Sequence, residues 1–207
     1  MSKVFKVGLI GCGHIAETYF RAHKYFNNFK IIKCADINEN AAKKCAKIHK
    51  IKAVNIKELL NDENINIILN LTIPAAHYKV SKQALLHGKH VYAEKPLAIN
   101  FKDGKRLIEL AKKKNLRVGN APDTFLGGGS QKSRALIDKK VIGKVIFGNA
   151  IFAYPGIQSY HPNPESWFAK QGGGPVIDMG PYYLTALVNL LGPAKEVLSQ
   201  SEKGKEK

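Results

Sequence analysis

The chain has 207 residues, of which 44% are hydrophobic and 24% charged, and its formal net charge is +17. This length suffices for one domain and a second, smaller one, and the composition excludes a peptide or a linker protein. No apolar run approaches the roughly 20 residues that cross a bilayer, so we expect no membrane partner. The first residues lead straight into a predicted strand without room for a signal peptide, from which we expect a cytoplasmic protein.

The positive charge raises the question of nucleic-acid binding, because a dense basic patch releases counterions from a phosphate backbone. The lysines are scattered along several predicted helices, aromatic residues do not alternate with them, and no nucleic-acid-binding module is recognisable. We therefore predict a solvated, lysine-rich surface and no nucleic-acid partner. An anionic substrate or nucleotide is the functional alternative.

The first part of the chain alternates predicted strands and helices. Strands are expected at 4–10, 30–36, 52–54, 65–72, 89–94 and 116–121, and helices at 14–26, 39–49, 56–61, 76–87 and 101–115. Apolar strands that alternate with helices form a parallel sheet covered on both faces. We predict an α/β fold, with a Rossmann dinucleotide-binding domain over residues 1–122 and ligands at the carboxyl ends of its strands.

The pattern changes after residue 122, where we expect a second domain over residues 123–207. A glycine turn at 127–129 and a helix at 130–139 precede a long predicted strand at 144–152. A turn-rich stretch, a helix at about 179–191 and one short strand follow, before a polar tail. We interpret this region as an incomplete α+β substrate domain.

The cysteines, at positions 12, 34 and 45, show neither metal nor redox spacing. They suit a reducing compartment, and we expect all three to be small buried apolar groups. The sequence therefore predicts no metal site.

A glycine turn, Gly11-x-Gly13-x-x-Ala16, follows the first predicted strand, and Asp36 ends the second. Gly11 permits the tight turn, Gly13 lets backbone N–H groups approach a pyrophosphate, and Ala16 lets the helix pack closely on the sheet. The strand, turn, helix and acid together predict a dinucleotide site with the phosphates at the helix N-terminus. A purely structural turn is the alternative.

Asp36 also predicts which coenzyme binds. A carboxylate at this position accepts hydrogen bonds from both ribose hydroxyls and repels a 2′-phosphate, which favours NAD over NADP. Ile37 and Asn38 follow it, so no cation is placed immediately after Asp36 to bind that phosphate. Lys43 and Lys44 lie farther along and keep NADP as the less favoured alternative.

Two further motifs are Glu94-Lys95-Pro96, after the fifth predicted strand, and Gly172-Gly-Gly-Pro-Val-Ile-Asp178-Met-Gly-Pro-Tyr182. With the glycine turn, they make the chain resemble the Gfo/Idh/MocA family, that of glucose–fructose oxidoreductase and inositol dehydrogenase, over essentially its whole length. The resemblance implies that Lys95 lies beside the nicotinamide and the substrate, and that the peptide bond before Pro96 is cis.

The resemblance also implies a catalytic group of Lys95, Asp178 and Tyr182. The family often has histidine at the last position, as acid or base for the substrate hydroxyl, and here a phenol replaces it, with Lys95 as the nearby cation. Asp178 and Tyr182 are four residues apart and project to one side of a helix that begins near Met179. As alternatives, Asp178 is a helix N-cap, Tyr182 is a packed aromatic residue, or Tyr183 does the work.

Further site residues follow from the strand ends and from the resemblance. His77 is expected to contact the nicotinamide half of the coenzyme, and His161 lies in a loop that similar proteins place near the substrate, with an exposed loop histidine as the alternative. The predicted coenzyme-binding residues are Gly11, Gly13, His14, Ile15, Asp36, Thr72, Pro74, His77, Glu94 and Lys95, and the predicted substrate-binding residues are Asp123, His161 and Tyr183.

These patterns favour a dehydrogenase that moves a hydride between NAD and a secondary alcohol of a sugar or polyol, while Tyr182 or Lys95 exchanges the hydroxyl proton. A nucleotide-binding module without catalysis and an NAD-dependent lyase or glycosidase, acting by transient sugar oxidation, are the alternatives. Family members are considerably longer, and from this we hypothesise a truncated or split gene product. We expect a homo-oligomer if the full domain is present, or a complementing chain.

Overall fold

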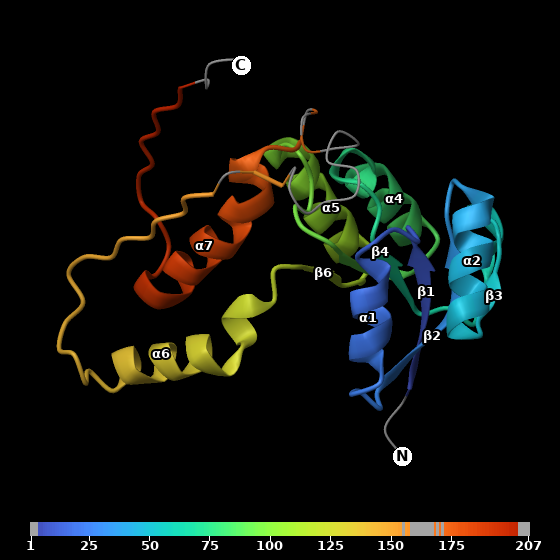
Figure 1. The fold of residues 1–207 in the computed structure, drawn as a ribbon, viewed down its shortest axis with the longest axis horizontal. Helices are drawn as coiled ribbons and strands as arrows, with labels where there is room; N and C mark the ends of the chain where they lie inside the picture. The colour runs from blue at the N-terminus through green and yellow to red at the C-terminus, as the bar shows by residue number, and fades with distance from the viewer. Residues whose placement is uncertain (1–3, 155, 158–167, 169, 171, 203–207) are drawn as a thin grey trace. The chain divides into compact units, whose positions relative to one another are not determined.

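The computed structural model describes residues 4–154, 156–157, 168, 170 and 172–202. They belong to two compact units, one within residues 1–122 and 155–181 and the other within 123–154 and 182–207 (Figure 1). The described residues of segment 155–181 thus belong to the same unit as the predicted Rossmann domain. No helix in the described ranges is long and apolar enough to cross a membrane.

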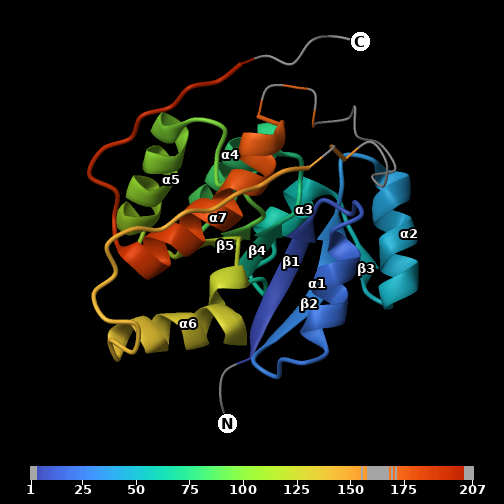
Figure 2. The same ribbon diagram turned by 60° about the vertical axis from the view of Figure 1, so that its left-hand side comes forward.

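The first unit contains a six-stranded parallel sheet, as the alternating pattern predicts. Its strands are β1 (Phe5–Ile10), β2 (Phe29–Ala35), β3 (Lys52–Ala53), β4 (Ile67–Asn70), β5 (His90–Ala93) and β6 (Val118–Asn120). Their order is β3-β2-β1-β4-β5-β6, and in Figure 2 the labels β5, β4, β1, β2 and β3 follow from left to right. The order reverses between β1 and β4, which is the switch point where such sheets bind ligands.

Helices cover both faces of this sheet. They are α1 (Ala16–His23), α2 (Glu39–His49), α3 (Ile56–Asn61), α4 (Pro74–Leu86) and α5 (Phe101–Lys113). Leu9 packs with Phe20 of α1 and Cys45 of α2, whereas its neighbour Ile10 packs in a second cluster with Leu85 of α4 and residues of α3 and α5. Successive residues of a strand point to opposite faces, so β1, β2, β4 and β5 each contribute to both clusters.

Asparagine side chains set the starts of several helices. Asn38, Asn55 and Asn100 accept hydrogen bonds from backbone N–H groups in the first turns of α2, α3 and α5. The predicted ranges 39–49 and 56–61 are confirmed to the residue, because an N-cap is a local signal. The first helix begins later than predicted because residues 13–15 form a turn, closed by the Ala16 N–H and the Gly13 carbonyl at 3.1 Å.

The second unit contains the 3₁₀-helix η1 (Thr124–Leu126), α6 (Gly128–Asp138) and, from residue 182 on, the helix α7 (Pro175–Leu191). Arg134 of α6 donates from Nη1 to the carbonyls of Asn189 (2.9 Å) and Leu190 (3.1 Å). These carbonyls lie in the last turn of α7, where the helix provides no N–H partner. Arg134 therefore ties α6 to the end of α7.

The strands predicted at 144–152 and after Pro193 are wrong. Both segments lie among the described residues and contain no strand. A strand needs a neighbour that binds its backbone N–H and C=O groups, and the described part of this unit offers none. Apolar side chains are exposed instead: Ile146 is 90% and Phe147 80% exposed. The β part of the predicted α+β domain is therefore absent from the described residues.

An ion pair joins β2 to the end of α3. Lys33 Nζ lies 2.7 Å from a carboxylate oxygen of Asp62. This hydrogen bond, with a second from the Asn64 N–H, lowers the pKa of Asp62 to about 2. Because the pKa of an aspartate in the unfolded chain is higher, about 3.9, the pair stabilises the fold above that pH, and its contribution is lost as the pH falls through about 2.

We expect Lys33→Met to lower the free energy of unfolding at neutral pH by about 0.5–1 kcal/mol, the range for partly exposed ion pairs. The loss relative to the unsubstituted protein should shrink between about pH 4 and pH 2, as the carboxylate takes up its proton. Urea unfolding over this range measures it, with Lys30→Met, an exposed lysine on the same strand, as the control. A loss that does not change with pH contradicts the assignment.

Candidate functional site

The glycine turn between β1 and α1 lies against the end of β4. Gly11 has a φ of +102°, and a Cβ there would lie 2.5 Å from the carbonyl carbon and oxygen of Leu71 and 2.7 Å from the nitrogen of Thr72. Only glycine fits both the dihedral angle and this close approach. A Cβ on Gly13, in contrast, would meet no described protein atom within 4 Å. The fold explains Gly11, whereas the role of Gly13 toward a pyrophosphate stays a prediction.

The N-terminus of α1 follows this turn. His14 and Ile15 are exposed, and Ile15, which precedes the helix, provides no side-chain cap. The first N–H groups of a helix have no partners within it, and they carry the positive end of the helix dipole. Ala16 is 3% exposed and packs in the cluster with Leu9 and Phe20, as its small size predicts. Here the Ala16 and Thr18 N–H groups donate to the carbonyls of Gly13 (3.1 Å) and Ile15 (3.0 Å), so what the helix end offers an anion is mainly its positive dipole.

Asp36 follows β2 and binds two backbone N–H groups. Its Oδ2 accepts from Cys12 at 2.7 Å and its Oδ1 from Asn38 at 2.8 Å. Each carboxylate oxygen has a further lone pair, which a ribose hydroxyl could use. The bond to Cys12 is a role that the sequence analysis missed: Asp36 fixes the glycine turn to the end of β2.

Two buried polar side chains, Asn70 and His77, hold the loop after β4, and His77 also reaches the loop after β5. The amide of Asn70, fully buried, donates to the Ser81 hydroxyl (2.9 Å) and the His77 carbonyl (3.1 Å), and accepts from the Thr72 hydroxyl (2.7 Å). His77 is 1% exposed, and its ring nitrogens lie 2.6 Å from the Pro96 carbonyl oxygen and 2.8 Å from that of Thr72. The His77 ring therefore positions these two loops.

Three predicted coenzyme contacts thus have evident structural roles. Pro74 is the first residue of α4, where a missing N–H needs no partner. The Thr72 hydroxyl and both ring nitrogens of His77 are engaged with protein atoms. Their contact with a coenzyme stays a prediction, and the loops that they hold are the predicted binding loops.

The Glu94-Lys95-Pro96 loop follows β5 and is held from α1. The Glu94 carboxylate accepts from the Tyr19 hydroxyl at 2.7 Å and from the Lys95 N–H at 3.1 Å. The Lys95–Pro96 peptide bond is cis, as the resemblance implies. A second cis bond, between Ala121 and Pro122, was not predicted.

Lys95 and Asp178 form an ion pair within the first unit. Lys95 Nζ donates to Asp178 Oδ1 and, at 2.8 Å, to the Asp178 carbonyl oxygen. The two side chains are only 14% and 10% exposed. Gly172, with φ +88°, precedes α7, and a Cβ there would overlap the Ile99 side chain. The structure thus joins two motifs that lie 83 residues apart in the sequence.

Asp178 is not a helix N-cap, and that alternative is wrong. Helix α7 begins at Pro175 rather than near Met179, so Asp178 lies in its first turn. Its N–H donates to the Gly174 carbonyl at 2.9 Å. The side chain is therefore free of the capping role and turns to Lys95.

The other predicted catalytic and substrate residues fall outside this pair. Tyr182 and Tyr183 lie in the part of α7 that belongs to the second unit, where the Tyr183 ring packs 5.4 Å from the ring of Phe152. Asp123 is exposed in the same unit, and His161 lies outside the described residues. Their roles toward a substrate stay predictions.

Comparisons with known proteins identify the class to which this fold and these loops belong. Residues 5–121 match the family model described as oxidoreductase family, NAD-binding Rossmann fold, and residues 130–207 match that of the GFO/IDH/MocA C-terminal domain. The chain is thus built on an NAD(P)-binding Rossmann domain followed by part of a second domain. It belongs to the Gfo/Idh/MocA family.

Individual relatives are similar over only part of their length. D-xylose dehydrogenase of Paenarthrobacter nicotinovorans is 25% identical over 77% of this chain and 43% of its own. Inositol 2-dehydrogenase/D-chiro-inositol 3-dehydrogenase of Lactiplantibacillus plantarum is 30% identical over 68% of this chain and 42% of its own. The crystal structure of the WlbA dehydrogenase of Bordetella pertussis, with NADH and UDP-GlcNAcA, has the same fold, with a TM-score of 0.80 and 20% sequence identity. The superposition covers 93% of this chain and 57% of that one. The chain spans about half the length of these relatives.

Proposed function

We propose that the chain takes part in hydride transfer between NAD and a secondary alcohol of a sugar, a polyol or a sugar derivative. The observation that supports this is the Lys95–Asp178 pair after β5, in which an ammonium and a carboxylate are largely removed from solvent. Family membership supports the redox class, and the sugar and polyol relatives support the substrate class.

The residues at the switch point fit a dinucleotide. The open side of Gly13 and the positive end of the α1 dipole suit a pyrophosphate. The free lone pairs of Asp36 suit the ribose hydroxyls, and its charge disfavours a 2′-phosphate, so we propose NAD rather than NADP.

In this proposal the nicotinamide supplies the hydride chemistry when bound, and the chain supplies orientation and proton transfer. Asp178 fixes the direction of the Lys95 ammonium by accepting its hydrogen bond. Lys95, or Tyr182 as the alternative, then exchanges a proton with the substrate hydroxyl. Desolvation of the pair strengthens the electrostatic effect of both charges on a substrate oxygen. The expectations of a homo-oligomer or a complementing chain, and of a cytoplasmic location, stay predictions.

We expect Asp36→Asn to reduce the discrimination between NAD⁺ and NADP⁺ by at least about fivefold, since the loss of repulsion between a carboxylate and a 2′-phosphate is worth about 1 kcal/mol or more. Competition of each nucleotide with NADH, followed by fluorescence, measures the ratio of dissociation constants. Asp103→Asn, a partly exposed first-turn acid of α5, is the control. An unchanged ratio with normal thermal unfolding contradicts the proposed role of Asp36.

Equilibrium binding and product analysis test the function itself. The full chain should quench NADH fluorescence with a stoichiometry of one, and NAD⁺ should be reduced in the presence of a member of a panel of aldoses, polyols and sugar nucleotides. Binding without turnover on any member would favour the nucleotide-binding module, and sugar products without net NADH would favour the lyase or glycosidase. Absence of NAD(H) binding overturns all three.

A further inference from the structure

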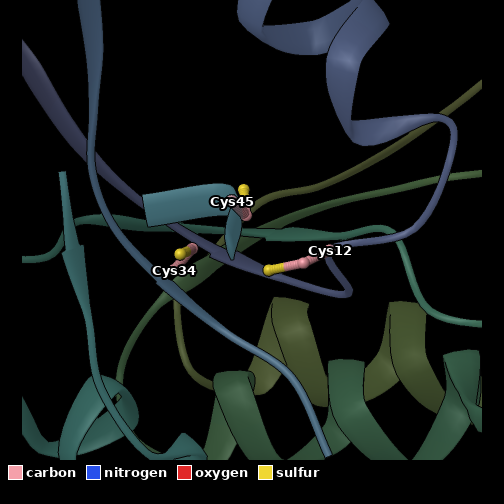
Figure 3. A group of neighbouring side chains, drawn as sticks. All are labelled: Cys12, Cys34 and Cys45. Carbon is pink, nitrogen blue, oxygen red and sulfur yellow. The ribbon is translucent and has the colours of Figure 1, made fainter. Parts of the chain in front are cut away.

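Three cysteine side chains meet in the first unit from three separate elements. Cys12 lies in the glycine turn, Cys34 on β2 and Cys45 on α2, and their Sγ atoms all lie within 4.8 Å of one another. Figure 3 shows the Cys12 side chain extending from the turn toward the other two. These are all the cysteines of the chain. Spacing along the sequence gave no sign of the cluster, because a strand and a helix separate its members.

None of the three thiols forms a disulfide, and two of them lie in the apolar interior. Cys34 is fully buried and Cys45 is 8% exposed, both within the cluster that contains Leu9 and Phe20, whereas Cys12 is partly exposed. Within the described chain, these thiols donate to carbonyls only from Cys12 to Ala35 (3.6 Å) and from Cys34 to Ala42 (3.5 Å), and a thiol is a weak donor. Little is lost when a cation replaces these protons.

The three sulfur atoms are mutual neighbours, which is the arrangement that one bound cation requires. The thiolate is the form of cysteine that binds a metal ion.

We propose that Cys12, Cys34 and Cys45 together bind one thiophilic metal ion, and that this ion is zinc(II). Zinc–sulfur bonds of about 2.3 Å place the sulfurs of a tetrahedral site about 3.8 Å apart, so the sulfurs need to move by about 1 Å or less. Thiolates select soft and borderline cations over magnesium and calcium. On binding, each cysteine releases its thiol proton to solvent, and no electrons are transferred.

Charge favours zinc(II) over copper(I). Three thiolates with zinc(II) carry a net charge of about −1, and with copper(I) about −2, and the apolar surroundings of Cys34 and Cys45 penalise the larger charge. A site with three protein ligands keeps a fourth position for water, and the partly exposed side of Cys12 is where this position is accessible. Cys12 also donates its N–H to Asp36, so the proposed metal site and the proposed coenzyme site share the glycine turn.

Cobalt(II) titration of the full chain, in a phosphine reductant and without nucleotide, tests the proposal. We expect thiolate-to-cobalt charge-transfer absorption and tetrahedral d–d bands that saturate at one equivalent and disappear when zinc(II) is added. Since the chain has no other cysteine, such a band arises from this group alone. No charge-transfer band, or saturation at another stoichiometry, overturns the proposal, and neither result bears on NAD binding.

Single substitutions show whether all three sulfurs take part. Cys12→Ser, Cys34→Ala and Cys45→Ala should each weaken cobalt binding by at least about tenfold, whereas His14→Ala, at an exposed position of the same turn, should not change it. Alkylation of Cys12 in the unsubstituted chain gives a second measurement if a buried-site variant does not fold. One equivalent of zinc should slow this reaction at least about tenfold, as expected for a thiolate held by a metal, and an unchanged rate contradicts the site.

Discussion

Substitution of Lys95 by methionine is expected to lower the rate of hydride transfer by at least about 10²-fold, the usual effect of losing a positioned acid or base. The dissociation constant for NADH should change little, because the Lys95 ammonium donates to the carboxylate and the carbonyl of Asp178, whereas the proposed pyrophosphate and ribose contacts come from the glycine turn and Asp36. Methionine keeps the length and apolar stem of the side chain and removes its N–H donors. Steady-state rates and NADH titration of the same preparation separate the two effects.

The same substitution should also destabilise the first unit. It leaves the Asp178 carboxylate, 10% exposed, without its cationic partner. Breaking a buried pair in this way costs about 3 kcal/mol, and the partial exposure places this site at the lower end of the range. The double variant Lys95→Met/Asp178→Leu should regain most of that stability, since neither charge is then left unpaired, while turnover stays lost. Urea unfolding of the two single variants and the double variant gives the coupling energy.

Lys89 provides a matched control for Lys95. It precedes β5, whereas Lys95 follows it; it is 7% exposed, and its ammonium donates to the Asp62 carbonyl at 2.7 Å. Lys89→Met should therefore lower stability without lowering turnover per folded molecule. Equal loss of turnover in the two variants, or loss of NADH binding in Lys95→Met, would remove Lys95 from the proposed catalytic role.

The parts of the fold that could be predicted are those with local signals. Asn38 and Asn55 cap α2 and α3 within three residues of sequence, and apolar runs mark the buried strands. The glycine turn and the Glu94-Lys95-Pro96 loop fall after strands, so their place at the carboxyl edge follows from the parallel sheet. The same reasoning failed at 144–152, because a β-like pattern makes a strand only when another strand pairs with it.

The contacts that sequence analysis missed join residues far apart in the chain. The Tyr19 hydroxyl reaches Glu94 across 75 residues, and the three thiols meet only after β1, β2 and α2 have packed. Asn70 could have been noticed in the sequence, because it is a polar residue within the apolar run 65–72. An amide buried there, as Asn70 is, needs hydrogen-bond partners. These residues position the predicted site without belonging to its motifs.

Gly11→Ala is expected to lower the free energy of unfolding by about 3 kcal/mol or more, which combines backbone strain at positive φ with overpacking. The new Cβ would lie 2.5 Å from backbone atoms of Leu71, which follows β4, so relief requires movement of the sheet edge rather than rotation of a side chain. NADH binding should be lost with the turn. Urea unfolding and NADH titration measure the two effects.

Gly13→Ala separates the requirement of the fold from that of the ligand. Its Cβ would enter open space, so stability should change by less than about 1 kcal/mol, in the direction of a small gain from the reduced freedom of the unfolded chain. If a pyrophosphate lies against Gly13, the methyl group should still weaken NADH binding by at least about tenfold, about 1.4 kcal/mol. Loss of stability in Gly13→Ala comparable to that of Gly11→Ala would mean that both glycines serve the turn alone. Normal stability together with normal NADH affinity would place the phosphates away from this turn, and with them the proposed coenzyme site.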